Sequence, residues 1–201
     1  MILYLDSLQE GQTAMYTLAS DLTWTKLEHD LPEAMVAHCS VQISQGVVAF
    51  IGGVPTASDL FANSKVEQIY IFDITANSGM EWSQPATLPA EVTRGAIMGC
   101  YKVPNENKVI FGCSYGPNEM TYEWNLDDDA ITQKTECRNQ RGVKFHVMPD
   151  GSIIGSGHGR NIWTFDSSSG LSRTSSDEQW TTSHNPPMSV VSPFKTGTCS
   201  T

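Results

Sequence analysis

The sequence predicts an all-β protein built from repeated sheets of four antiparallel strands. Three observations lead to this prediction. Similar short apolar segments recur about every 50 residues along the chain, which is the signature of a repeat architecture. Within these segments apolar and polar residues alternate, as they do in half-buried strands. Finally, 16 glycines and 10 prolines among 201 residues, with only 17% charged residues, indicate many turns and no long helices.

The first two strands of each unit are expected to form a hairpin. The first strand is of mixed polarity, and its three copies are residues 37–43, 97–103 and 142–147. The second strand is apolar and ends at glycine, and its copies are residues 47–51, 108–111 and 152–154. Short polar turns such as 44–46 separate the two, which is typical of hairpin loops. Residues 1–5 correspond to the second strand of a shortened first unit.

The third and fourth strands of each unit are marked by aromatic residues. The third strand ends in Asp, which favours a turn, and its copies are residues 68–73, 121–127 and 161–166, with 14–18 as a weaker fourth copy. The fourth strand is short and is marked by Trp24, Trp82 and Trp180. The middle unit has no such Trp, and 130–132 is expected to replace it. An insertion at 54–65 lengthens the first complete unit.

The order Gly52-Gly53, Tyr70, Trp82 resembles the kelch repeat, in which two glycines are followed by Tyr and then Trp. This resemblance implies a β-propeller whose blades are the four-stranded sheets. The other two units depart from it, because the second has Gly112-Cys113 and no Trp, and the third has Gly155-Ser156-Gly157. In such a fold the aromatic residues pack one blade on the next. The expected structural positions are Gly52, Gly53, Tyr70, Trp82, Trp24, Trp163 and Trp180.

One domain of about four blades accounts for the chain. We expect a partial blade at 1–27, full blades at 37–85, 96–134 and 142–183, and a closing strand at 188–194. If the closing strand joins the partial blade, the ring closes with four blades, within the known range for propellers. The alternative is that the chain is a fragment of a six- or seven-bladed molecule.

The charges disfavour nucleic acid and anionic membrane surfaces as partners, because 22 acidic residues oppose 12 basic ones for a net charge of −10. No apolar stretch is long enough to insert into a membrane. His38 and His146 lie on innermost strands, but no third ligand accompanies them, so hydrogen-bonded structural histidines are expected. The run Asp127-Asp128-Asp129 lacks EF-hand spacing and predicts a solvated turn.

Catalytic motifs are also missing from the sequence. There is no Gly-x-Ser-x-Gly elbow, and some oxidases have kelch-like propellers but this chain shows no Tyr/His/His copper set. We therefore expect a non-enzymatic interaction module with a protein partner and no cofactor. The alternatives are an enzyme with its site in the channel or on a face, and a structural segment of a larger extracellular protein.

Two loops are the expected binding surface of such a module. The link from the second to the third strand is long in two neighbouring units, and corresponding loops of a propeller emerge on one face. The candidate binding residues are Asp59 and Phe61 in the first loop, and Tyr115 and Asn118 in the second. Exposed aromatic residues often anchor interfaces, and the alternative is that Phe61 folds back to cover its own blade. Phe61→Ala and Tyr115→Ala are thus expected to weaken partner binding in a binding titration while leaving the melting temperature nearly unchanged.

Cys39 and Cys100 occupy equivalent innermost positions of neighbouring units. A disulfide requires Cα atoms within about 7 Å, and we expect this pair to lie near enough to bond. Cys113 with Cys137 is the next candidate pair, and free buried thiols are the alternative. Secreted invertebrate kelch-like proteins often carry Cys at such positions, so the resemblance implies an extracellular location, with a cytoplasmic one as the alternative.

Overall fold

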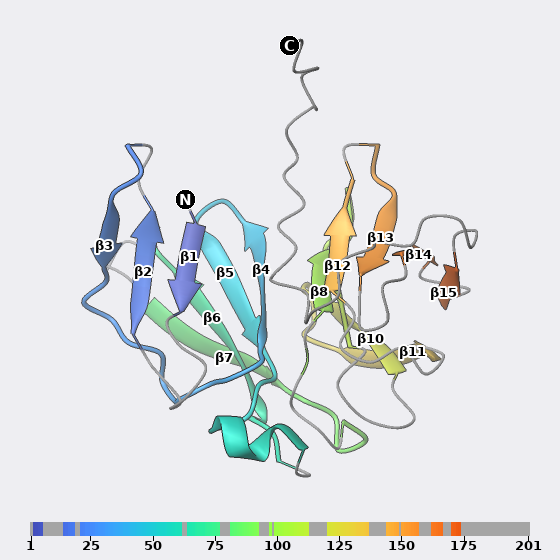
Figure 1. Cartoon of the computed structure of the whole chain (residues 1–201), viewed down its shortest axis with the longest axis horizontal. Coiled ribbons are helices and arrows are strands. Elements are labelled where there is room, and N and C mark those ends of the chain that lie inside the picture. The colour runs from blue at the N-terminus through green and yellow to red at the C-terminus, as the bar shows by residue number, and fades with distance from the viewer. Residues whose placement is uncertain are drawn as a thin grey trace, which may run out of the picture.

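The all-β prediction is confirmed by the computed structural model (Figure 1). The structure describes residues 2–5, 14–18, 21–61, 64–76, 81–92, 97, 99–112, 120–136, 144–148, 150–156, 162–166 and 170–173. These residues form four antiparallel sheets and one short 3-10 helix, η1 (Ala57–Phe61), and contain no α-helix. No helix among them is long and apolar enough to cross a membrane.

Each sheet is made of strands that are consecutive in the chain. The first sheet has three strands, β1 (Ile2–Leu5), β2 (Met15–Leu18) and β3 (Trp24–Lys26). The second comprises β4 (Cys39–Ser44), β5 (Val47–Ile51), β6 (Gln68–Asp73) and β7 (Glu81–Thr87). The third comprises β8 (Gly99–Lys102), β9 (Lys108–Gly112), β10 (Met120–Asn125) and β11 (Ile131–Glu136). The fourth comprises β12 (Lys144–Val147), β13 (Ile153–Ser156), β14 (Ile162–Asp166) and β15 (Gly170–Arg173).

The last strand of the fourth sheet differs from the prediction. The segment around Trp180 was expected there, but β15 at Gly170–Arg173 pairs with β14 instead. Asp166 is opposite Gly170, so β15 takes the place beside β14 that the later segment was expected to occupy. Trp180 and the expected closing strand 188–194 lie outside the described residues.

The first and second sheets pack against each other through a shared core. Met15 of β2 is fully buried against Phe50, Tyr70 and Phe72 of the second sheet, and the linker between the sheets contributes Leu31 to the same cluster. The Tyr70 hydroxyl donates a hydrogen bond of 2.6 Å to Glu33 Oε1, which fixes that linker to the sheet. The Tyr70 ring lies 6.2 Å from Trp82, edge to face, so these two predicted structural residues do meet in the core.

The opposite face of the second sheet packs on the third sheet. Ala49, Ile51 and Ile69 join Phe111 and Trp124 in one buried cluster. Because Phe50 faces the first sheet while Ala49 and Ile51 face the third, both faces of β5 are buried. This explains why the second strand of the repeat is continuously apolar instead of alternating. The third sheet in turn meets the fourth, where the rings of Tyr101 and Phe145 lie 5.5 Å apart.

Two expectations about structural residues have different outcomes. Gly52 and Gly53 are buried with φ values of 70° and 97°, the left-handed region that only glycine enters easily. Trp24, in contrast, is 49% exposed, so its prediction as a core residue is wrong. The reason is its place on β3, which is the outer strand of its sheet and is exposed along its length. The side chain of Trp163 lies outside the described residues.

Candidate functional site

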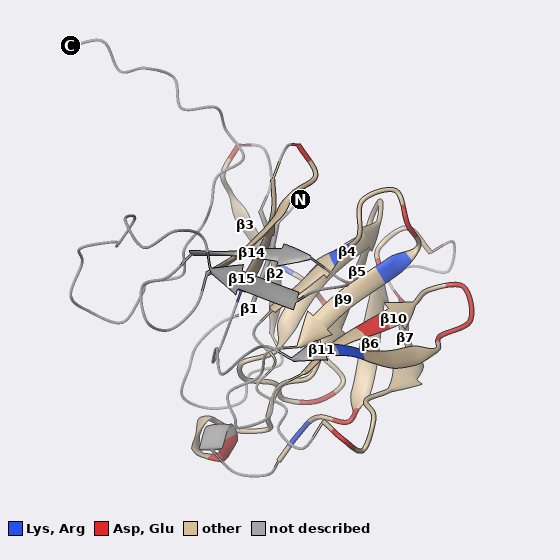
Figure 2. Cartoon of the chain, turned by 90° about the vertical axis from the view of Figure 1, so that its right-hand side faces the viewer, with Lys and Arg blue, Asp and Glu red and all other residues tan. Residues whose placement is uncertain are grey.

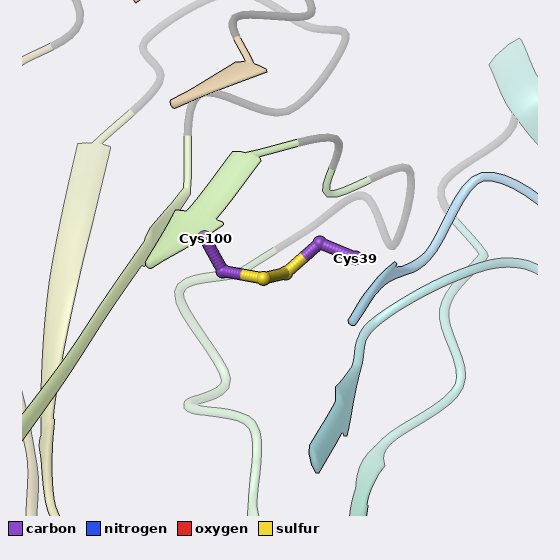
Figure 3. The surroundings of a disulfide bond; sticks show 2 residues. All are labelled: Cys39 and Cys100. Carbon is purple, nitrogen blue, oxygen red and sulfur yellow. A yellow bond between two sulfur atoms is a disulfide. The ribbon is translucent and has the colours of Figure 1, made fainter. Parts of the chain in front are cut away.

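The disulfide predicted between Cys39 and Cys100 is present and joins the second sheet to the third (Figure 3). The Cα atoms are 6.0 Å apart. Cys39 lies opposite Ile51 of β5, and Cys100 lies opposite Phe111 of β9, so the two cysteines occupy equivalent positions of the repeat. Cys113 and Cys137 lie outside the described residues.

We expect removal of this bond, in the variant with both Cys39→Ala and Cys100→Ala, to lower the free energy of unfolding by about 2–4 kcal/mol. The crosslink spans 61 residues and restricts the unfolded chain, which is why its loss favours unfolding. Urea denaturation with and without reductant measures the effect. The urea midpoint of the parent protein should fall in reductant, and that of the double variant should stay the same. A parent midpoint that does not change in reductant would contradict the prediction.

A groove lies beside the disulfide, where the inner strands of three sheets meet. Its volume is about 530 Å³, within the range of roughly 300–1,000 Å³ found for ligand sites. The strand β8 lies next to both β4 and β12, and this arrangement creates the groove. The lining comes from β4, β8, the hairpin after β8, and β12: Ser40, Val41, Gln42, Cys100, Tyr101, Lys102, Val103, Pro104, Asn105, Phe145 and Val147.

The chemistry of the groove is apolar with a polar margin. Tyr101 and Phe145 are buried, whereas Val147 is 43% exposed and offers an apolar surface to solvent. Lys102 is the one charged residue in the described part of the lining, and its Nζ donates a hydrogen bond of 2.9 Å to the backbone oxygen of Glu106. None of the described residues that line the groove carries a carboxylate or an imidazole. Figure 2 shows many of the Asp and Glu residues in the turns of the chain.

His38 and His146 do not form a shared site among the described residues. The His38 ring packs on Phe50, with 5.8 Å between centroids, on the side of the second sheet that faces the first. His146 is opposite Ile154 in the fourth sheet. His38 differs from the hydrogen-bonded histidine expected, because its buried Nδ1 has no hydrogen-bond partner in the described part of the chain. Within that part, no three His, Cys, Asp or Glu side chains come together to hold a metal ion.

Burial lowers the pKa of His38 from 6.5 to about 4, because the charged imidazolium loses its hydration. The unfolded chain binds this proton near pH 6.5 and the folded chain only near pH 4. Stability is therefore expected to fall as the pH decreases through this window, by about 3 kcal/mol in total. Denaturation curves between pH 4 and pH 7 would measure this loss.

The variant His38→Gln is the control, because it removes this titration and keeps a polar side chain of similar reach. Burial also lowers the pKa of His146, so the comparison of the two proteins, and not either curve alone, isolates His38. Parallel pH profiles for parent and variant would show that His38 is not responsible.

Of the four predicted binding residues, the described part of the structure places the side chain of Asp59 alone. Asp59 lies in η1, where it accepts a hydrogen bond of 2.7 Å from Thr56 Oγ1, so it stabilises its own turn. The backbone of Phe61 ends η1, but its side chain lies outside the described residues, as do Tyr115 and Asn118. The groove was missed from sequence because no motif marks it; the only signal was the mixed polarity of the innermost strands.

The acidic run Asp127-Asp128-Asp129 makes local contacts. Asp127 accepts a bond of 2.6 Å from Asn107, and Asp129 accepts one of 3.2 Å from the Trp124 indole. Asp128 accepts a bond of 3.1 Å from the backbone N–H of Ala130. The run is exposed in the β10–β11 turn, as the sequence predicted, and Asp127 also links this turn to the one before β9.

Comparison with known proteins does not place the chain in a family. No family profile matches it, and no curated protein matches its sequence. Among solved structures, the NanB sialidase from Streptococcus pneumoniae is 14% identical with a TM-score of 0.45, covering 78% of this chain and 24% of its own. A fungal alcohol oxidase of the AA5 family, in complex with copper, is 12% identical with a TM-score of 0.45, covering 82% of this chain and 49% of its own. The chain therefore spans less than half the length of either.

Proposed function

We propose that this chain is a non-enzymatic binding module that holds a segment of a protein partner in the groove between β4, β8 and β12. The observation that supports this most is the groove itself, whose described lining combines an apolar base with a polar margin and a single cation. This combination of apolar core and polar rim is typical of protein interfaces. The net charge of −10 disfavours nucleic acid as the ligand.

We further propose that the sheets are the blades of a kelch-like propeller. The three strands of the first sheet correspond to the second, third and fourth strands of the complete sheets, so the position of its inner strand, next to β1, is open among the described residues. Segment 188–194 is the candidate for that position and would close a four-bladed ring. An extracellular location is consistent with the disulfide, because such bonds persist in oxidising compartments.

Selection of linear peptides from a phage-displayed library on the oxidised full chain tests the proposed function. We expect peptides that bind the parent and lose at least about tenfold in affinity with Val147→Asp, which places a charge in the groove. Leu22→Asp is the matched control, because Leu22 is 77% exposed in a turn and is not part of the lining. It should leave binding unchanged.

The other outcomes of this selection are equally informative. Failure to select any peptide with the folded chain would overturn the proposal. Some peptides could bind Val147→Asp as well as the parent but fail to bind Phe61→Ala. This result would place the site in the loops predicted from sequence and would overturn the groove as the binding surface.

A further inference from the structure

The backbone of β4 borders the groove with an unpaired edge. β4 is the terminal strand of the second sheet, and on its other side no strand of the described chain is hydrogen-bonded to it. In an edge strand, about half of the N–H and C=O groups point away from the neighbouring strand. These groups are available to a ligand that can supply a matching set of donors and acceptors.

The residues that line the groove show that it meets this edge and not a sheet face. Successive side chains of a strand point to opposite faces, so a groove across one face would be lined by every second residue. Here three consecutive residues of β4 line it, namely Ser40, Val41 and Gln42. A ligand in the groove therefore lies alongside the β4 backbone.

Among the described strands, the unpaired edge of β4 has fewer neighbouring strands than that of β8. β8 lies close to both β4 and β12, so strands of two other sheets flank its unpaired edge. The disulfide fixes β4 and β8 together at Cys39, the first residue of β4, and the groove lining continues from there along both strands. This covalent link holds the groove in one shape before a ligand arrives, which reduces the entropy lost on binding.

We infer that the groove accepts an extended segment of the partner protein, which adds to β4 as a further strand and places an acidic side chain beside Lys102. This inference rests on the proposed function and specifies its ligand. Main-chain hydrogen bonds to β4 supply affinity in this mode of recognition, and side-chain pockets supply specificity. Lys102 is the only charge among the described residues of the lining, and a carboxylate is its complement. The exposed surface of Val147 would contact an apolar side chain of the same segment.

N-methylation of a selected peptide, one residue at a time, tests strand addition directly, because each methyl group removes one backbone donor. Methylation at alternate positions should lower affinity for the full chain at least about tenfold, and at the intervening positions by less than about twofold. Side-chain docking without strand pairing would not produce this period of two. A flat profile would overturn strand addition while leaving the binding function intact, whereas failure to select any peptide would remove both.

Charge reversal at Lys102 tests the acidic residue. Lys102→Glu should lower the affinity for a selected acidic peptide at least about tenfold. A peptide in which Lys replaces the acidic residue should regain affinity for that variant. Lys26→Glu on β3 is the matched control, because Lys26 is exposed and outside the groove, and it should change neither affinity. Equal effects of Lys102→Glu and Lys26→Glu on affinity would overturn the placement of the acidic side chain beside Lys102.

A photo-crosslinking group at Gln42 identifies the occupant. Crosslinks to the added peptide are the expected result. Crosslinks to the chain's own residues 174–201, with none to the peptide, would show that this segment occupies the β4 edge and would overturn the inference.

Discussion

Replacing Trp124 with alanine is expected to remove about 3–5 kcal/mol from the free energy of unfolding. Trp124 is fully buried where the third sheet packs against the second, and its indole N–H bonds to Asp129 in the following turn. Truncation leaves a large cavity and removes the hydrogen bond to the exposed Asp129. Guanidinium denaturation followed by far-UV circular dichroism measures the loss.

The matched control is the same substitution at Trp24. That side chain is 49% exposed on an outer strand, so less apolar area returns to water, and a loss of about 1 kcal/mol is expected. Similar losses for the two variants would mean that the packing between the second and third sheets contributes no more than an outer strand does.

The second large effect is expected from Gly112→Ala, which should cost about 4 kcal/mol or prevent folding. Gly112 is buried at the end of β9 with φ of 142°. An added Cβ would collide with the backbone oxygen of Met120 and would lie 2.9 Å from the Thr121 Cα. Both atoms belong to β10, which pairs with β9 at this point, so the strands would have to separate.

The variant Gly151→Ala is the control, because it measures the cost of backbone strain without a steric collision. Gly151 also has positive φ, at 84°, but no atom lies within 4 Å of an added Cβ. Only the conformational cost of about 1 kcal/mol should appear in the denaturation curve. If both variants lose the same amount, the collision at β10 is relieved by local movement and the strong effect predicted for Gly112 is wrong.

The sheets were predictable from sequence because each strand carries a local signal that burial enforces. Val47–Ile51 is apolar throughout because both of its faces pack against other sheets, and the hairpin turn before it is marked by Gly46 at φ of 76°. The Cys39–Cys100 pair could be found because a repeat places equivalent residues in equivalent positions. In these cases the information lies within one unit or in the spacing between units.

Features that depend on position in the whole molecule were not predictable. Trp24 and Trp82 look alike in sequence, but Trp82 packs on aromatic side chains of its own sheet, with its ring 4.7 Å from Phe72, whereas Trp24 is 49% exposed. The groove is a similar case. It requires inner strands of three sheets to converge, and residues such as Ser40 and Gln42 carry no motif that records this convergence.

The covalent link between the second and third sheets also determines how the chain responds to a pulling force. A force on the two ends passes through the sulfur atoms from Cys39 to Cys100 and bypasses the segment between them. That segment covers a sequence separation of 61 residues, which would otherwise extend by about 200 Å when stretched. The oxidised chain is thus shorter under tension by this length, and the second sheet bears no load between its first strand and its last.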